Sequence, residues 1–400
     1  MENDIKIKVD FYNGCKVEIL GLQDKVYPVD DLYRIEFFNN KTGKLIYSTE
    51  ITPNHWTKPD IFYFIEWRIF VYKNNEKILN QVINLKNEEV LIAMESKPIG
   101  DCVSWIPHIL EFSKQHKCKV TVQTYFHELF SAYYPYLNYV KPQTYQLNDD
   151  KFFASYVVQY GVTDQESKNN QNDLNKHKSW NFVPGLSFWD KRESPFHPNL
   201  KPLAEFGSSV LGLDPDERRP IFTQHSDERP IDKKYICISE FASGIEKHWQ
   251  NQIGWQTLVD DLSKMGYEII SISKEKSNLK NITKRNGNIP LNDRIWYLQH
   301  CEFFIGVSSG LSWLAWACGK KVVMISGITK KENEFKEDCV RIINENVCNG
   351  CWNIEEHCDK FVMRKINFCP EGKNFTCSRS ISPKYVLEKI NEEILNNVVD

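Results

Sequence analysis

Cysteine residues concentrate near the carboxyl end of the chain. Five of the twelve cysteines fall within residues 348–377, and the first two have the spacing Cys-x-x-Cys, which presents both thiols from one tight turn. Two more thiols a short loop away complete a tetrahedral set of ligands for a soft metal ion. The spacing therefore predicts a four-cysteine structural metal knuckle. The five residues are Cys348, Cys351, Cys358, Cys369 and Cys377.

Two other interpretations of these cysteines are open. They are five unrelated buried thiols, or the disulfides of a secreted domain. Because we find no signal peptide at the start of the sequence, we expect a reducing compartment, where disulfides are disfavoured. The metal site is the better explanation of the spacing, and we expect a cytoplasmic protein.

A strand–helix–strand unit is predicted for residues 302–327, where two short apolar runs flank a helix with apolar residues at turn spacing. The turn between the first strand and the helix reads Ser308, Ser309, Gly310 and Leu311. Backbone N–H groups at the start of a helix bind anions such as phosphate, and the helix dipole favours negative charge there. Serine and glycine also cap helices that bind no ligand. The sequence leaves both possibilities open.

The composition limits the class of protein. Four hundred residues are enough for two or more domains with separate cores. The hydrophobic share of 41% is ordinary, and no apolar run approaches the length of a membrane span, so we expect no membrane span. A formal net charge of −3 argues against a dedicated nucleic-acid binder, which needs a basic face.

The hydrophobic pattern divides the chain into five parts. Alternating apolar and polar residues, with a hairpin turn at Asn13-Gly14, predict an antiparallel β module. Alternating strands and helices predict an α/β fold with two Rossmann-like domains. The parts are residues 1–88 (β module), 89–232 (first Rossmann-like domain and connection), 233–345 (second Rossmann-like domain), 346–380 (cysteine segment, predicted to be the metal knuckle) and 381–400 (carboxyl-terminal helix).

Several motifs, taken together, are specific for one family. They are Ile238-Ser239-Glu240 with Gly254-Trp255, residues 306–317, Val323-Met324-Ile325-Ser326-Gly327, Cys348-Asn349-Gly350-Cys351-Trp352-Asn353, Phe368-Cys369-Pro370 and residues 375–381. With these motifs the chain resembles the bacterial autotransporter heptosyltransferases over most of its length. The resemblance implies a two-Rossmann GT-B fold and inverting transfer of heptose from ADP-heptose. It further implies serine acceptors on an autotransporter adhesin passenger domain, a cytoplasmic location, one iron ion per chain and a ring-like homo-oligomer.

The resemblance assigns the iron to four of the five cysteines. They are Cys348, Cys351, Cys369 and Cys377. Cys358 is an additional thiol next to His357 and is an alternative to one of the four. Thiolates also bind zinc, so only the resemblance selects iron.

The resemblance implies that Asp101, in the motif Pro98-Ile99-Gly100-Asp101, is the catalytic base. An inverting transferase needs a carboxylate that takes the proton of the acceptor hydroxyl while the anomeric carbon of the sugar is attacked. Asp101 closely follows the strand predicted at 90–94, and open parallel sheets bind ligands at that end of their strands. The alternative is an N-cap for the helix predicted from Cys102.

The donor diphosphate must be stabilised as it leaves. No Asp-x-Asp metal motif stands at a suitable strand end, so backbone N–H groups and basic side chains are expected to supply the positive charge. We expect the N–H groups of residues 308–311 to contribute, with Lys247 and Lys274, each just beyond a predicted strand end, and with Ser239 from the matching motif. Ordinary surface lysines are the alternative. His127 and His225 are interpreted as structural.

Two alternative functions remain from the sequence. A lipopolysaccharide-type heptosyltransferase uses the same donor on a lipid-linked sugar, and predicts a basic, membrane-facing acceptor lobe that residues 89–200 do not clearly show. A non-catalytic scaffold built on the metal site is the other.

Overall fold

The computed structural model describes residues 5–12, 15–59, 61, 64–147, 149–158, 201–222, 227–357 and 368–396. The Asn13-Gly14 turn, His225 and Cys358 lie outside the described residues. The described residues form two compact units. The first lies within Met1–Ser96, His108–Pro195 and Gly207–Pro215, and the second within Lys97–Pro107, Phe196–Phe206 and Asp216–Asp400.

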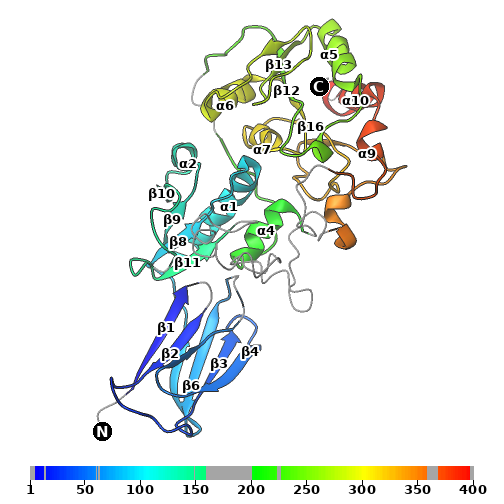
Figure 1. The fold of residues 1–400 in the computed structure, drawn as a ribbon. Coiled ribbons are helices and arrows are strands. Elements are labelled where there is room, and N and C mark those ends of the chain that lie inside the picture. The colour runs from blue at the N-terminus through cyan, green and yellow to red at the C-terminus, as the bar shows by residue number, and fades with distance from the viewer. Residues whose placement is uncertain are drawn as a thin grey trace. The chain divides into compact units, whose positions relative to one another are not determined.

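The first unit contains a four-stranded antiparallel sheet (Figure 1). Its inner strands bury every second side chain, among them Ile35, Phe37, Ile69 and Val71, which explains the alternating sequence pattern. In spatial order the strands are β4 (Leu45–Ile51), β3 (Tyr33–Asn39), β6 (Trp67–Lys73) and β7 (Glu76–Val82).

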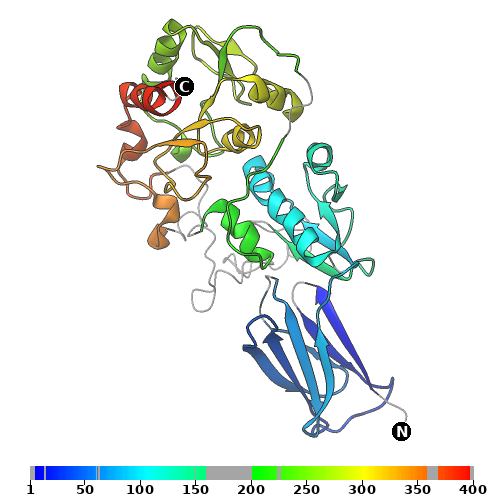
Figure 2. The same cartoon turned by 180° about the vertical axis from the view of Figure 1, so that it is seen from behind.

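A seven-stranded mixed sheet completes the first unit. Its strand β1 pairs in parallel with β11, with Phe11 opposite Ala154, so one sheet joins strands from both sides of residue 88. The order is β10 (Asn138–Val140), β9 (Lys119–Gln123), β8 (Glu89–Ala93), β11 (Ala154–Val157), β1 (Lys6–Tyr12), β2 (Lys16–Leu20) and β5 (His55–Thr57). The amino-terminal strands of both sheets, blue in Figure 2, lie next to one another.

The second unit is built on a six-stranded, wholly parallel sheet, as the strand–helix alternation predicts for a Rossmann-like domain. Its order is β14 (Thr283–Lys284), β13 (Glu268–Ser271), β12 (Tyr235–Ser239), β15 (Phe304–Val307), β16 (Val322–Ile325) and β17 (Cys339–Ile342). Its longer helices are α5 (Gly254–Lys264), α6 (Leu291–His300), α7 (Gly310–Ala317) and α10 (Pro383–Ile390).

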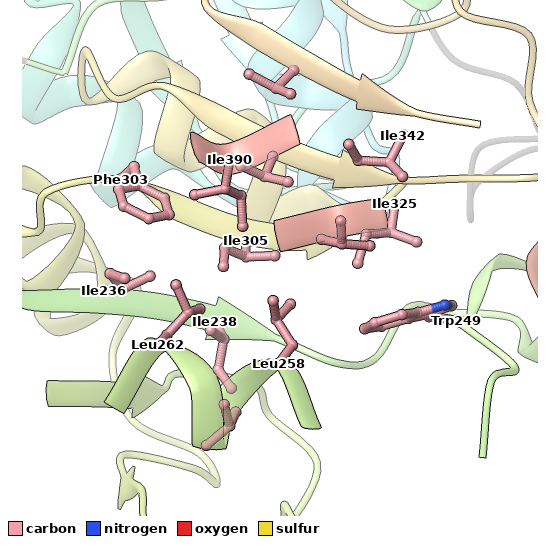
Figure 3. Packing of buried hydrophobic residues seen from close by; sticks show 14 of the residues in the cluster. Ile236, Ile238, Trp249, Leu258, Leu262, Phe303, Ile305, Ile325, Ile342 and Ile390 are labelled. Atoms are coloured by element: carbon pink, nitrogen blue, oxygen red, sulfur yellow. The ribbon is translucent and has the colours of Figure 1, made fainter. Parts of the chain in front are cut away.

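The core of the second unit lies between the sheet and two helices. Figure 3 shows Ile238, Ile305 and Ile325 from central strands packed with Leu258 of α5 and Ile390 of α10. Each fully buried side chain of this size contributes about 1.5–3 kcal/mol. The carboxyl-terminal helix therefore belongs to this core, and the strand ends at the sheet edge are held in fixed positions.

The remaining helical elements include α1 (Ile99–His116) and α4 (Leu203–Val210), each of which begins in the second unit and ends in the first. None of the helices in the described ranges combines the length and the apolar character that crossing a membrane requires. The shorter elements are α2 (His127–Tyr133), η3 (Ile245–Lys247), η4 (Cys351–Asn353), α9 (Thr376–Arg379) and η5 (Asn391–Leu395).

Candidate functional site

The turn between β15 and α7 lies at the carboxyl edge of the parallel sheet. Ser309 is the N-cap of α7, with extended backbone (φ −148°, ψ 166°), but its side chain makes no capping hydrogen bond. Its Oγ is buried and has no hydrogen-bond partner in the described part of the chain. The first N–H groups of a helix have no partner within the helix. The start of α7 is therefore not capped by its own serine, and its first N–H groups and the Ser309 hydroxyl stay candidates for binding a ligand.

Two glycines bring the start of α1 against the start of α7, within the second unit. A Cβ atom added to Gly310 would lie 3.0 Å from the backbone N of Gly100, and one added to Gly100 would lie 3.1 Å from the Cα of Gly310. Such spacing is tighter than ordinary van der Waals contact. Any side chain at Gly310 would also meet Ile99. A Gly310 substitution would therefore displace α1, and it does not test donor binding alone.

Asp101 is the next residue after this contact. It is half-buried and lies in the first turn of α1, which begins at Ile99, so it is not the N-cap of that helix. A carboxylate in the first turn is stabilised by the helix dipole, by about 0.3–1 kcal/mol. Its backbone carbonyl accepts a hydrogen bond from Ser104 Oγ at 2.7 Å. The candidate base Asp101 thus directly follows Gly100, whose backbone contacts Gly310 in the candidate anion-binding turn. Its role as base stays a prediction.

Hydroxyl groups gather where β12 and β13 end. Ser239 Oγ lies 3.1 Å from Ser273 Oγ, and Ser271 Oγ donates to Oε2 of Glu240 at 3.2 Å. Burial raises the pKa of the Glu240 carboxyl, against the hydrogen bonds from Ser277 and Ser271. Glu240 stands in the family motif, but no pattern in the sequence indicated a buried acid there.

The two lysines expected to bind the diphosphate, Lys247 and Lys274, differ in their surroundings, and His127 lies elsewhere. Lys247 is half-buried in η3, and its Nζ lies 6.0 Å from the ring centroid of Trp352 in the cysteine segment. Lys274 is exposed just after β13. His127, in the first unit, lies 3.7 Å from the carboxylate of Glu128. Lys247 is therefore more constrained by its surroundings than Lys274. That either lysine binds the diphosphate stays a prediction.

Glu246 is a buried acid that the sequence did not indicate. Its side chain lies in η3 and is 1% exposed, and neither carboxylate oxygen bonds to another residue in the described ranges. Burial raises its pKa from 4.5 to about 7, although its own backbone amide and the charge of Lys247 oppose the shift. The carboxylate packs against Gly244, where a Cβ would collide with it.

We expect the pH dependence of stability to change in Glu246→Gln. An acid whose pKa is higher in the folded state than in the unfolded state destabilises the fold as pH rises from 4.5 to 7, because the unfolded chain ionises first. Between pH 4.5 and pH 8, wild type should lose about 3 kcal/mol relative to the variant, at about 1.4 kcal/mol per pKa unit. Thermal unfolding at several pH values measures this, with the exposed Glu345→Gln as control. Parallel pH profiles for wild type and Glu246→Gln would contradict it.

The four predicted metal ligands lie close to one another. Cys351 and Cys377 are buried, and Cys348 and Cys369 are half-buried. Burial raises the pKa of the Cys351 thiol to about 12, with smaller contributions from the thiols of Cys377, Cys348 and Cys369. Burial also raises the pKa of Cys377 to about 11, with contributions from Cys348 and Cys369.

A metal site is not formed by these thiols in the described residues. Within ranges that include 348–357 and 368–377, no three His, Cys, Asp or Glu side chains are arranged to hold a metal ion. The donor set nevertheless fits a soft metal chemically, because four adjacent thiols need a cation to ionise together. The four-cysteine metal site therefore stays a prediction, and Cys358 lies outside the described residues.

Comparison with known proteins bears on the whole chain. Residues 203–367 match the model of glycosyltransferase family 9 (heptosyltransferase). The autotransporter heptosyltransferase Aah of Escherichia coli is 28% identical over 395 residues, which cover 94% of this chain and 90% of Aah. The protein is a glycosyltransferase, and its residues 203–367 are similar to family 9. Its resemblance to the autotransporter heptosyltransferases is confirmed.

Solved structures confirm the glycosyltransferase fold. The iron-containing dodecameric glycosyltransferase TibC of enterotoxigenic E. coli aligns with a TM-score of 0.79 and 24% identity, covering 98% of this chain and 97% of TibC. A second TibC structure contains ADP-D-β-D-heptose. The E. coli lipopolysaccharide heptosyltransferase II aligns less fully, with a TM-score of 0.54 and 13% identity over 77% of this chain and 99% of that one.

Proposed function

We propose that this glycosyltransferase moves heptose from ADP-heptose to serine hydroxyls of an autotransporter adhesin passenger domain in the cytoplasm, with inversion. The observation that carries the proposal is the contact of Gly100 with Gly310, because it joins the turn bearing Asp101 to the turn expected to bind the diphosphate. The relatives' names support the sugar and the acceptor class.

In the proposed reaction, Asp101 accepts the proton of the serine hydroxyl while the serine oxygen attacks the anomeric carbon. The bond from that carbon to the diphosphate breaks, and ADP leaves with the electron pair. The N–H groups at the start of α7, the Ser309 hydroxyl and Lys247 stabilise its developing charge, with Lys274 and Ser239 as further candidates.

The proposal includes one structural iron ion per chain, held by four cysteine thiolates, with zinc as the alternative. A closed four-thiolate site has no open position for substrate, so the metal orders the cysteine segment and takes no part in the transfer. The expected ligands are Cys348, Cys351, Cys369 and Cys377. We also propose a homo-oligomer, of ring form, since TibC is dodecameric.

A transfer assay tests the function. The purified protein is incubated with ADP-heptose and either a serine-bearing passenger fragment or a lipid-linked acceptor, and intact mass and released ADP are measured. We expect ADP release and a heptose mass increment on the passenger fragment only. Transfer to the lipid acceptor alone would support the lipopolysaccharide-type alternative, and transfer to neither would contradict both.

A further inference from the structure

The hydroxyl of Ser308 donates its hydrogen bond to another residue of the protein. It is the first residue after β15, it is 6% exposed, and its Oγ donates a hydrogen bond to Oε1 of Glu334. A serine hydroxyl has a single proton to donate. Ser308 Oγ is therefore not a donor toward a bound diphosphate. Of the two serines in this turn, Ser309 has the hydroxyl that is not committed within the described residues.

The Glu334 carboxylate is held on several sides. Its side chain is 2% exposed and pairs with Arg341 of β17 at 2.5 Å. Thr329 Oγ1 donates to Oε2 at 3.3 Å, and Asn333 Nδ2 donates to Oε1 at 3.1 Å. A buried ion pair seldom adds stability over a well-packed apolar pair, and its best-attested benefit is to select one arrangement. The Arg341 charge also offsets the negative charge of Glu334, which would otherwise repel an anion at the turn.

The cysteine segment also hydrogen-bonds to the loop between β16 and β17, which carries Glu334. Asn353 Nδ2 donates to Asn333 Oδ1 at 2.8 Å, and the backbone N of Lys330 donates to Asn353 Oδ1 at 2.8 Å. The backbone N of Trp352 donates to the carbonyl of Ile328 at 2.8 Å. A continuous set of hydrogen bonds thus runs from the cysteine segment through Asn333 and Glu334 to Ser308.

We propose that Glu334 is a positioning residue for the donor: through Ser308, it fixes the turn whose N–H groups bind the diphosphate of ADP-heptose. This inference rests on the proposed function, and it deepens the account of the donor site. Glu334 itself does not touch the donor. It acts by removing alternative positions of the Ser308 side chain and of the backbone that follows, so the N–H groups at the start of α7 are oriented before the ligand arrives.

The test is a double-mutant cycle with ADP affinity, measured by calorimetry, as the readout. Ser308→Ala should weaken ADP binding about tenfold, because it removes a charge-assisted hydrogen bond, and Glu334→Gln should weaken it by about threefold to tenfold, because a neutral amide oxygen replaces the charged acceptor. The variant with both changes should bind no more weakly than Ser308→Ala alone, because Glu334→Gln acts on the hydrogen bond that Ser308→Ala already removes. In the transfer assay, KM for ADP-heptose should rise about tenfold while kcat changes little.

A matched control separates positioning from general stability. Glu268 Oε1 accepts a hydrogen bond from Thr283 Oγ1 at 2.7 Å at the start of β13, so Glu268→Gln removes a similar charge far from the turn. It should leave ADP affinity unchanged. If Glu334→Gln does not fold, because the buried Arg341 charge loses its carboxylate partner, Glu334→Gln with Arg341→Met removes both charges and is measured instead.

The outcomes are distinguishable. Additive losses in the cycle, or wild-type ADP affinity in folded Glu334 variants, would overturn the positioning role and leave the proposed function standing. Absence of ADP binding by wild type would overturn both.

Discussion

Asp101→Asn should bind ADP-heptose but transfer heptose about 10²–10⁴ times more slowly than wild type. An amide of the same size cannot accept the proton that the acceptor hydroxyl must lose, and loss of a positioned base costs about that factor. The fold should survive, since a first-turn carboxylate contributes only about 0.3–1 kcal/mol to its helix. Single-turnover rates with saturating donor, together with ADP affinity, measure the effect.

The control for Asp101 lies on the same helix. Glu111 is half-buried farther along α1, and Glu111→Gln removes a carboxylate without approaching the α7 turn. It should keep kcat within about twofold, because it touches no reacting atom. If Asp101→Asn retains activity within a few-fold of wild type, Asp101 is not the base, and another acceptor of the proton must be sought.

Loss of one predicted metal ligand should have the largest effect on the cysteine segment. In Cys351→Ser, metal content should fall from about one ion per chain toward zero, because a structural site needs all four thiolates. The segment from 346 to 380 should then lose its fold, since metal binding supplies folding energy in such sites. Elemental analysis measures occupancy, the absorption spectrum distinguishes iron from zinc, and limited proteolysis reports unfolding.

Other thiols provide the comparison for Cys351. Cys118 is buried in the first unit, outside the cysteine segment, so Cys118→Ser should keep full metal occupancy. The ligand set itself is tested with Cys358, Cys369 and Cys377 as single serine variants. Full occupancy in Cys369→Ser or Cys377→Ser, together with loss in Cys358→Ser, would show that Cys358 is a ligand in place of one of the proposed four.

The sequence determined the elements of the second unit well. The strand–helix–strand unit predicted for residues 302–327 is present as β15, α7 and β16. These signals are local: a helix repeats its apolar side chains every three to four residues, and a buried parallel strand is a short apolar run. The family motifs also lie within short segments. The glycosyltransferase assignment therefore needed no knowledge of which segments meet.

The tertiary structure decided which distant residues share a site. Nothing in a polar run such as Lys330-Lys331-Glu332-Asn333-Glu334 distinguishes the last acid from its neighbours, yet only packing against Arg341 and Ser308 makes it a buried, paired carboxylate. Gly100 similarly gives no sign in the sequence that it meets Gly310. Side-chain periodicity reports which face of an element is buried. It does not report the partner, because the partner depends on where each charge, hydroxyl and backbone group stands once the whole sheet has assembled.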